Sequence, residues 1–177
     1  MAALMEKIAT LKRKQNINVF LCGLRGSGKT TLLYKSLITN WQTICNEIEP
    51  TTLFHYENLR FDRTEYGIWD FSGDMQVTAV VFLINAMDES EMSRNEIMDR
   101  IQTMQRDDAF RASLFFILFN TISMEVDATG MEKYIRSNLS GKENVLFFSF
   151  NASLGLHDPA WVKTLQLIHL HHKKNAH

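Results

Sequence analysis

The amino-acid sequence predicts a three-layer α/β domain with a mostly parallel sheet and one antiparallel hairpin at its edge. Three observations lead to this fold class. Apolar runs alternate with helical patterns along the chain, which is typical of strand–helix units. Four of the runs are almost continuously apolar, as in strands buried on both faces of a parallel sheet. A glycine-rich segment joins the first run to the first helical pattern.

Six apolar runs predict the strands. The second and third alternate more between apolar and polar residues, and the short polar stretch Arg60–Arg63 joins them, so we expect an antiparallel hairpin there. The expected strands are Ile17–Cys22, Leu53–Leu59, Glu65–Phe71, Val77–Asn85, Leu114–Phe119 and Asn144–Phe150.

Helical periodicity fills the gaps between these strands. In the longest helical pattern Ile97, Ile101 and Met104 share one face. Asp158 and Pro159 are typical of a helix start, with the aspartate as N-cap and the proline in the first turn. The expected helices are Lys29–Trp41, Glu91–Arg111, Met131–Leu139 and a last helix from Pro159 onward.

The first sixteen residues differ from the rest, so we divide the chain into an amphipathic helix, 1–16, and a nucleotide-binding domain, 17–177. Leu4, Ile8 and Leu11 recur at helical spacing before a short basic run. We expect this helix to dock on its own domain; a membrane-surface helix and a weak mitochondrial presequence are the alternatives. Ala2 excludes N-myristoylation, which requires glycine at that position.

Composition narrows the functional class. The 177 residues favour a single domain, and a net charge of −1 gives no reason to expect a nucleic-acid partner. No apolar run is long enough for a membrane span, and Cys22 and Cys45 are too few for a disulfide framework. We expect a cytoplasmic protein, with a mitochondrial location as the alternative.

The segment Gly23–Thr30 (GLRGSGKT) matches the full P-loop pattern and lies between an expected strand and an expected helix. Its glycines let backbone N–H groups turn toward one centre, where the helix N-terminus adds partial positive charge. Lys29 then reaches the β- and γ-phosphates, and the Thr30 hydroxyl is a ligand for Mg²⁺.

Two further residues are candidates for the Mg²⁺ site. Asp70 ends a strand expected beside the P-loop strand, where a carboxylate acts on Mg²⁺ from the second coordination shell. Thr51 offers a hydroxyl from the loop before the hairpin. The structural alternatives are an ordinary aspartate at a strand end and an ordinary threonine at a strand start.

These residues resemble the Arf/Arl family of small GTPases. The segment GLRGSGKTTLLYK is similar to that family's P-loop and first helix, EPTTLF to its switch I, and WDFSGD to its switch II motif. Asn120–Ser123 (NTIS) falls where its guanine-reading NKxD motif should lie, and Ala152 where its last base-contacting loop should lie. The resemblance spans nearly the whole chain and is strongest up to Asp70.

The resemblance implies a small-GTPase-like P-loop fold that binds GTP or GDP with Mg²⁺. It implies Mg²⁺ ligation by Thr30 and Thr51, and base contacts by Asn120 and Ala152. The residues that it implies for phosphate contact are Gly23, Leu24, Arg25, Gly26, Ser27, Gly28, Lys29, Thr30 and Thr31.

The catalytic positions depart from the family pattern. Asp74 stands in place of the catalytic glutamine, whose amide both donates to and accepts from the attacking water and the phosphate. An ionised aspartate cannot donate, so we expect slow or absent hydrolysis. Gly73 remains and can offer its backbone N–H to the γ-phosphate. Arg25, next to the γ-phosphate position, is either a built-in arginine finger or, as we favour, a solvent-facing side chain.

The base-reading motif departs as well. NTIS lacks the lysine and the aspartate of NKxD. The missing carboxylate would accept from guanine N1–H and the exocyclic amine, and the loss of such a contact removes about 1–3 kcal/mol of discrimination. ATP therefore remains an alternative to GTP.

The segment between two strands expected to be parallel is short. Only Ser72–Thr78 separates Glu65–Phe71 from Ala79–Asn85, the part of the next strand expected to run parallel to it, whereas a parallel crossover normally takes a dozen residues or more and includes a helix. The switch II region is therefore shortened, and one face of the sheet would be exposed beside the phosphate site. We expect a protein partner or a rearranged segment to cover it.

Three functions follow as hypotheses. The first is a divergent Arf-like nucleotide-binding protein with slow or absent hydrolysis that acts through a protein partner. The second is an active GTPase switch in membrane traffic or ciliary transport. The third is a structural subunit of a larger complex, in mitochondria as one possibility, that keeps its nucleotide as a folding cofactor. The late histidines, such as His169 and His172, suggest a polar helix end more than a metal site.

Overall fold

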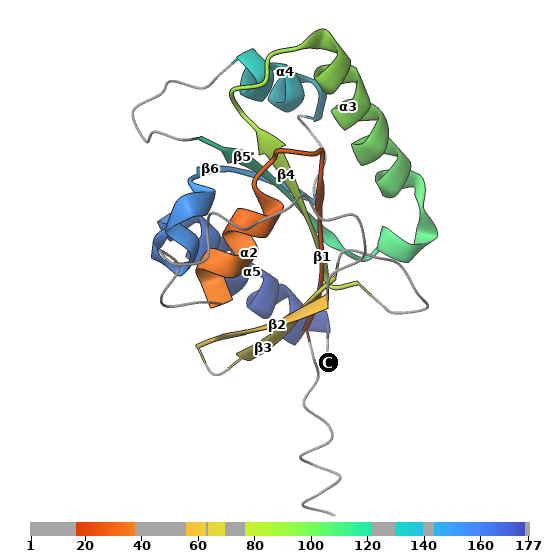
Figure 1. Ribbon diagram of the computed structural model, residues 1–177. Helices are drawn as coiled ribbons and strands as arrows, with labels where there is room; N and C mark the ends of the chain where they lie inside the picture. The colour runs from red at the N-terminus through yellow and green to blue at the C-terminus, as the bar shows by residue number, and fades with distance from the viewer. Residues whose placement is uncertain are drawn as a thin grey trace, which may run out of the picture.

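The computed structural model describes residues 17–37, 56–62, 64–69, 77–121, 130–139 and 144–175. The strands in these ranges are β1 (Ile17–Gly23), β2 (Tyr56–Phe61), β3 (Thr64–Trp69), β4 (Ala79–Asn85), β5 (Leu114–Asn120) and β6 (Val145–Phe150). They form one sheet in the order β2-β3-β1-β4-β5-β6 (Figure 1). Among these strands β2 and β3 pair antiparallel, and every other pair is parallel. The predicted sheet and its edge hairpin are confirmed.

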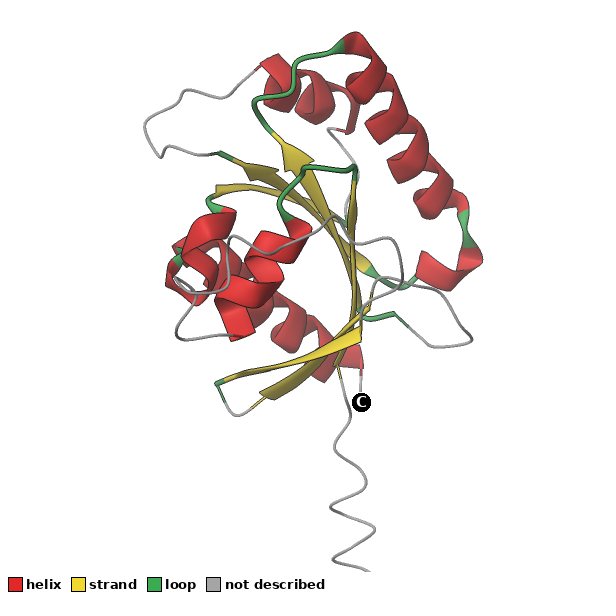
Figure 2. Ribbon diagram, viewed as in Figure 1, coloured by secondary structure: helices red, strands yellow, loops and turns green. Residues whose placement is uncertain are grey.

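Helices cover both faces of the sheet. They are α2 (Lys29–Leu37), α3 (Glu91–Arg106), α4 (Gly130–Leu139) and α5 (Pro159–Asn175), with the 3-10 turns η2 (Asp108–Phe110) and η3 (Ala152–His157). Figure 2 shows α2 and α5 on one side of the sheet and α3 and α4 on the other. The predicted three layers are confirmed.

Each face of the sheet has its own hydrophobic core because side chains alternate along a strand. In β4, Val81 packs in the core that contains Trp161 of α5. The next residue, Phe82, packs in the core that contains Ile101 of α3. Ala79–Ile84 of β4 are all buried, which explains why this strand is apolar without interruption.

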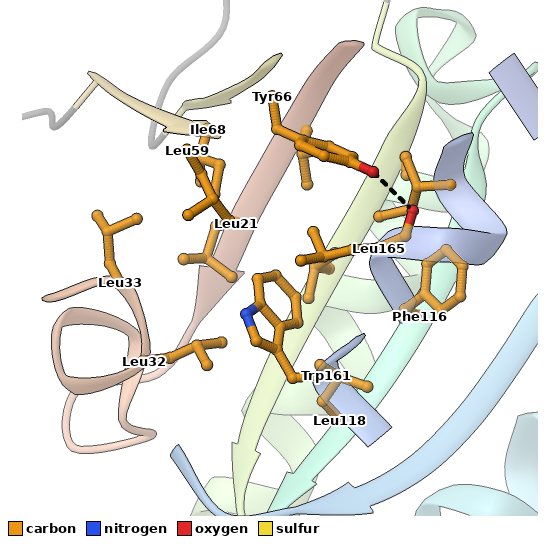
Figure 3. Packing of buried hydrophobic residues seen from close by; sticks show 14 of the residues in the cluster. Leu21, Leu32, Leu33, Leu59, Tyr66, Ile68, Phe116, Leu118, Trp161 and Leu165 are labelled. Carbon is orange, nitrogen blue, oxygen red and sulfur yellow. Dashed lines mark hydrogen bonds between the residues drawn. The ribbon is translucent and has the colours of Figure 1, made fainter. Parts of the chain in front are cut away.

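A buried tyrosine joins the hairpin to the last helix (Figure 3). The Tyr66 hydroxyl donates to the Leu165 carbonyl oxygen at 3.1 Å, and Tyr66 is 1% exposed. Burial, with a smaller effect from the negative charge of Asp62, raises the pKa of Tyr66 to about 12. Near the start of β3, the Thr64 hydroxyl lies 3.4 Å from Nδ1 of His169. The β2–β3 hairpin is therefore fastened to α5 through β3.

The helix predicted to run to Arg111 ends earlier, at Arg106. Asp107 is extended, and its carboxylate accepts from the Ala109 N–H at 2.9 Å, so it caps the separate turn η2. The apolar stripe itself stops at Met104, since Asp107 and Asp108 stand at the next positions of the helical period, so the predicted extension to Arg111 was wrong. The break turns Phe110 onto the sheet, where its ring lies 5.5 Å from that of Phe20.

The connection between β3 and β4 is short because the two strands are staggered along β1. β3 pairs with Ile17–Phe20 of β1, whereas β4 pairs with Val19–Gly23. The described end of β3 and the start of β4 thus lie at almost the same level, two strand spacings or about 10 Å apart. The nine residues 70–78 can span that distance without a helix.

The large apolar exposure expected on this face of the sheet is not found among the described residues. Phe20 is half-buried and packs with Phe110 and Val77 in a small cluster. The exposed large hydrophobic side chains in the described ranges are Met87, Met92 and Leu170, none of which belongs to β1 or β3. Within the described ranges, exposed apolar surface therefore does not mark a partner site on this face.

The edge strand β6 carries aromatic side chains covered by cations. The Arg136 guanidinium lies 4.9 Å from the centre of the Phe147 ring, and the Lys163 amine lies 5.2 Å from that of Phe148. Arg136 is also paired with the buried Glu132 at 2.7 Å. Each face of this strand is thus shielded by a basic side chain from a neighbouring helix.

Several predictions lie outside the described residues. They are the helix 1–16, the end of the helix predicted to reach Trp41, and the strand start at Leu53, all of which remain predictions. Within the described ranges, no helix combines the length and apolar character needed to cross a bilayer.

Candidate functional site

The loop between β1 and α2 has the backbone of an anion cradle. Gly23, Gly26 and Gly28 adopt φ values of 143°, 79° and 95°, which side chains other than glycine rarely accept. A Cβ at Gly23 would overlap the Leu83 carbonyl oxygen of β4. These positions require glycine, and the turns they allow direct backbone N–H groups toward one centre.

Lys29 holds its amine against this loop. Its Nζ donates to the carbonyl oxygens of Gly23 and Leu24, each at 2.9 Å. The same residue begins α2, so its charge adds to the partial positive charge of the helix N-terminus. The loop can therefore bind a phosphate group.

The remaining loop residues lie around this cradle. Ser27 is buried, and Leu24 is half-buried. Arg25 is exposed at the tip of the loop, as the solvent-facing interpretation expects. Thr30 and Thr31 occupy the first turn of α2 and are half-buried. A hydroxyl oxygen such as that of Thr30 suits Mg²⁺, which prefers oxygen ligands.

Asn120 joins the phosphate loop to the loop after β6. Its Nδ2 donates to the Ser27 carbonyl oxygen at 3.1 Å, and its Oδ1 accepts from the Ala152 N–H at 3.0 Å. A Cβ at Gly28 would overlap Asn120 Nδ2 and would lie 3.2 Å from the Ala152 Cβ. The structure thus brings together four residues that the sequence assigned to one site, Ser27, Gly28, Asn120 and Ala152.

Thr121 turns away from this junction. It is 7% exposed, and its hydroxyl lies 3.3 Å from the Phe150 carbonyl oxygen, which also accepts from its backbone N–H at 2.8 Å. The lysine of the NKxD motif would stand at this position. In this chain the side chain instead fastens the end of β5 to the end of β6.

The sequence did not reveal how the loop after β6 is held. Asn151 Oδ1 accepts from the Ser153 N–H at 2.9 Å and from its hydroxyl at 2.6 Å. The Asn151 N–H donates to Asp158 at 2.9 Å. Asp158 also accepts from the N–H groups of Ala160 and Trp161, each at 2.9 Å, which confirms it as the N-cap of α5. The Asn-x-Ser spacing was the available signal for the first of these contacts.

The turn η3, which begins at Ala152, packs closely on α2. Gly155 has φ 52°, and a Cβ there would lie 2.5 Å from the Lys35 carbonyl oxygen. Next to this contact, Trp161 Nε1 donates to the Ser36 hydroxyl oxygen at 3.0 Å. The helix that follows the phosphate loop therefore also supports the loop after β6.

The remaining candidates lie outside the described residues. Thr51, Asp70, Gly73 and Asp74 are among them, as is Ser123 of NTIS, so their assigned roles remain predictions. In the described part of the chain, no group of three histidine, cysteine or acidic side chains could hold a metal ion.

The late histidines belong to the end of α5. His171 Nε2 lies 3.2 Å from the Ala112 carbonyl oxygen. Burial lowers the pKa of His172, and the nearby His169 and His171 lower it further. These contacts fit the polar helix end that the sequence suggested.

Comparison with known proteins gives a consistent result. The family model described as "ADP-ribosylation factor family" matches residues 2–145. ADP-ribosylation factor-like protein 1 of Drosophila melanogaster is 23% identical over 164 residues, covering 86% of this chain and 88% of that protein. Its Caenorhabditis elegans counterpart is 23% identical over 170 residues, covering 88% and 90%. ADP-ribosylation factor J of Dictyostelium discoideum is 24% identical over 122 residues, covering 63% and 62%.

Proposed function

This chain belongs to the ADP-ribosylation factor family of small GTPases, and we propose that it holds GTP or GDP with Mg²⁺ while hydrolysing GTP slowly or not at all. The observation that carries the nucleotide assignment is the loop Gly23–Gly28 closed by the Lys29 amine. In a protein of this family, a loop of this kind binds the phosphates of a nucleotide.

The phosphate end of the site has the residues that this role requires. Lys29 supplies a point charge, and the first turn of α2 supplies N–H groups that have no partner within the helix itself. Thr30 would hold Mg²⁺ together with Thr51, and Asp70 would act through a bound water. When bound, Mg²⁺ neutralises part of the charge on the β- and γ-phosphates.

Slow hydrolysis is proposed from the residue at the catalytic position. Asp74 replaces a glutamine that must both donate and accept. Its negative charge also opposes the approach of a hydroxide-like water to the γ-phosphate. Arg25 is exposed, and none of its contacts within the described ranges holds its guanidinium over the cradle. The chain would therefore act as a long-lived nucleotide-bound form that a protein partner recognises, as small GTPases generally do.

Nucleotide binding is tested first. Protein purified without added nucleotide should release GTP or GDP on denaturation, as identified by chromatography. Lys29→Ala should lower GTP affinity by about tenfold or more, because it removes a charge-assisted contact. Lys173→Ala, at the exposed end of α5, is the matched control and should bind normally. Equal affinity of both variants for GTP would contradict the cradle.

Hydrolysis is tested separately, by single-turnover phosphate release from bound GTP. Asp74→Gln should raise the rate by about tenfold or more, within the range for positioning one water. Asp99→Gln, on the exposed surface of α3, should leave the rate unchanged. Rapid hydrolysis by the unaltered chain, slowed by Asp74→Gln, would make Asp74 a working base and the protein an active switch.

A further inference from the structure

We propose that the outer edge of β6 (Val145–Phe150) is a docking surface to which a partner protein adds one extended, acidic strand. This mode of recognition uses the backbone of a sheet edge for affinity and the alternate side chains of the added strand for selectivity. The inference does not rest on nucleotide binding, because no nucleotide takes part in the contact. The two properties are measured separately and can fail separately.

The outer edge of β6 carries backbone groups that the described sheet leaves unpaired. β6 is the last strand in the sheet order, with β5 on its inner side (Figure 1). The Phe115 N–H donates to the Asn144 carbonyl oxygen at 2.9 Å, and the Thr121 N–H donates to that of Phe150 at 2.8 Å. Groups facing one neighbour recur at every second residue of a strand, so the even-numbered residues of β6 bond to β5. The residues whose N–H and C=O groups point outward, without a partner among the described residues, are Val145, Phe147 and Ser149.

Packing on both faces fixes β6 before any partner arrives. Phe147 packs in the core that contains α3 and α4, and its ring lies 6.4 Å from that of Phe119. Phe148 packs in the core that contains α5, and its ring lies 6.5 Å from that of Phe116. The edge is thus ordered in the isolated chain. A strand that adds to it requires little further ordering of this protein, which favours binding.

The exposed charges around this edge are basic. In the described ranges from residue 130 to residue 175, the acidic residues are Glu132 and Asp158, which are 5% and 2% exposed. Glu132 is paired with Arg136, and Asp158 caps α5. Lys133 and Lys163 are exposed, and no described carboxylate pairs with Lys163. An added strand therefore meets positive charge that the described residues do not neutralise, which selects for carboxylates on that strand.

A second copy of the chain fits this edge less well than an acidic strand. Two β6 strands paired about a two-fold axis would bring the same side chains of both copies to one border. Those side chains include Arg136 and Lys163, which lie over the rings of Phe147 and Phe148. Like charges placed side by side oppose strand pairing. Charge complementarity therefore favours a partner segment of opposite sign.

A synthetic peptide tests the proposal on the unaltered chain. The probe is about eight residues long and repeats two glutamates followed by two valines, so an extended form carries carboxylates on both faces. It should bind about tenfold or more tightly than the same peptide with lysine for glutamate. Binding should be weaker at about 500 mM than at about 50 mM salt. Proline at two adjacent central valines removes backbone donors and should abolish binding.

Three results of this titration would overturn the proposal. They are equal affinity for the glutamate and lysine peptides, equal affinity for the glutamate and proline peptides, and no binding of the glutamate peptide at about 1 mM. The first would remove the role of charge, and the second would remove the role of the backbone. The third would show that the edge is closed to an added strand.

Hydrogen exchange locates the contact on β6. The amides of Val145, Phe147 and Ser149 should exchange about tenfold more slowly when the glutamate peptide is present at ten times its dissociation constant. The amides of Leu146 and Phe148 already bond to β5, so they are the internal control and should change little. Slowing confined to β2, at the opposite border of the sheet, would place the site elsewhere and overturn the proposal.

Two substitutions at one position test the outward backbone group. Ser149→Pro removes the outward N–H together with the hydroxyl, which donates to Glu132 at 3.1 Å. Ser149→Ala removes the hydroxyl alone. The proline variant should bind the glutamate peptide about tenfold or more weakly than the alanine variant, with melting temperatures confirming that both are folded. Equal peptide affinity of two folded variants would contradict pairing at this edge, and the proline peptide decides the question if Ser149→Pro does not fold.

Charge and self-association are tested last. Lys163→Glu should weaken binding of the glutamate peptide by about tenfold, whereas Lys174→Glu, an equal change of charge at the far end of α5, should not. Equal affinities of these two variants would overturn the charge argument. Sedimentation equilibrium of the unaltered chain should show a monomer. A dimer that Lys163→Glu strengthens and Ser149→Pro dissociates would show that a second copy occupies the edge, and would overturn the proposal.

Discussion

Single side chains in this molecule matter most where they join two elements. Tyr66 fastens β3 to α5, and Asn120 fastens the phosphate loop to the loop after β6. Each makes contacts between residues far apart in the sequence. The loss of such a contact affects both elements, and its cost depends on whether a buried group is left without a partner.

Tyr66→Phe should lower the free energy of unfolding by about 1 kcal/mol, because the ring stays and the hydrogen bond to Leu165 is lost. Urea denaturation at pH 8 measures this difference. Tyr134→Phe, on α4, is the matched control and should have little effect. Equal stability of Tyr66→Phe and the unaltered chain would contradict the contact.

The pH dependence of Tyr66 follows from its raised pKa. An acid whose pKa is raised in the folded state contributes stability below its ordinary value of 10.0 and loses it as pH rises toward about 12. The unaltered chain should therefore lose stability relative to Tyr66→Phe between these values. Denaturation at pH 9 and pH 11 tests the sign, and a constant difference would be inconsistent with a buried phenol.

Gly28→Ala should weaken GTP binding more than Gly26→Ala. Both glycines have positive φ, at 95° and 79°, so both substitutions introduce backbone strain. At Gly28 the new Cβ also overlaps Asn120, whereas at Gly26 it meets nothing within 4 Å. The difference in GTP affinity between the two variants isolates the overlap, and equal affinities would show that only backbone strain matters.

Among the helices and strands, α2 makes contacts beside the site at both of its ends. The phosphate loop leads directly into its first turn. Near its other end Lys35 packs closely against Gly155 of η3. Ser36 completes the attachment by accepting from Trp161 of α5 at 3.0 Å and donating to Leu32 at 2.8 Å. Helix, turn and last helix are thereby held as one unit beside the phosphate loop.

Ser36→Ala should lower the free energy of unfolding by about 1–3 kcal/mol, because it leaves the buried indole N–H of Trp161 unpaired. A double-mutant cycle with Trp161→Phe measures the coupling, since the phenyl ring needs no acceptor. Additive effects of the two substitutions would contradict the hydrogen bond. Ser137→Ala, on the exposed face of α4, serves as the control.

The end of α5 should respond to acid. The pKa of His172 is lowered from 6.5, chiefly by burial, so the fold favours its neutral form. Its contribution to stability is present above pH 6.5 and is lost as pH falls through the lowered value. His172→Gln should flatten the fall in melting temperature between pH 7 and pH 5, and His157→Gln should not. The same acid response in His172→Gln as in the unaltered chain would contradict this.

Helix and strand boundaries show where sequence patterns reach their limit. Continuous apolar runs predicted the buried strands well, because burial on both faces leaves little choice of residue. The end of α3 was missed because the helix was extended past Met104, the last apolar position of its stripe, while the aspartate cap at Asp107 is a local event. The stagger of β3 and β4 along β1 is a property of strand register, which no single strand encodes.

At the scale of the whole molecule, the phosphate end and the base end of the site differ in how far the sequence predicts them. The phosphate end was predictable because one continuous segment, Gly23–Thr30, supplies it. The base end was predictable only in outline. Its contacts join Asn120 to Ala152 and Asn151 to Asp158, and such pairs form only when β5, β6 and α5 are placed together.

Loss of a bound nucleotide should lower the stability of the whole domain. A ligand held at a hundred times its dissociation constant adds about 2.7 kcal/mol to stability, which for a domain of this size corresponds to a melting temperature about 5–10 °C higher. Removal of Mg²⁺ with EDTA, followed by gel filtration, should lower the melting temperature by that amount and reversibly. An unchanged value would argue against binding, and unfolding without recovery would favour the folding-cofactor hypothesis.

The basic side chains over β6 bear on the tendency of the protein to aggregate. The strand VLFFSF is an uncharged, strongly β-forming segment at the border of the sheet, the kind that seeds fibrils when it is bare. Arg136 belongs to α4, the element before β6, and Lys163 belongs to α5, which follows β6 after the turn η3. A chain that is still folding, or is partly unfolded, lacks these cation contacts. Its tendency to precipitate should therefore depend on how soon α4 and α5 pack against β6.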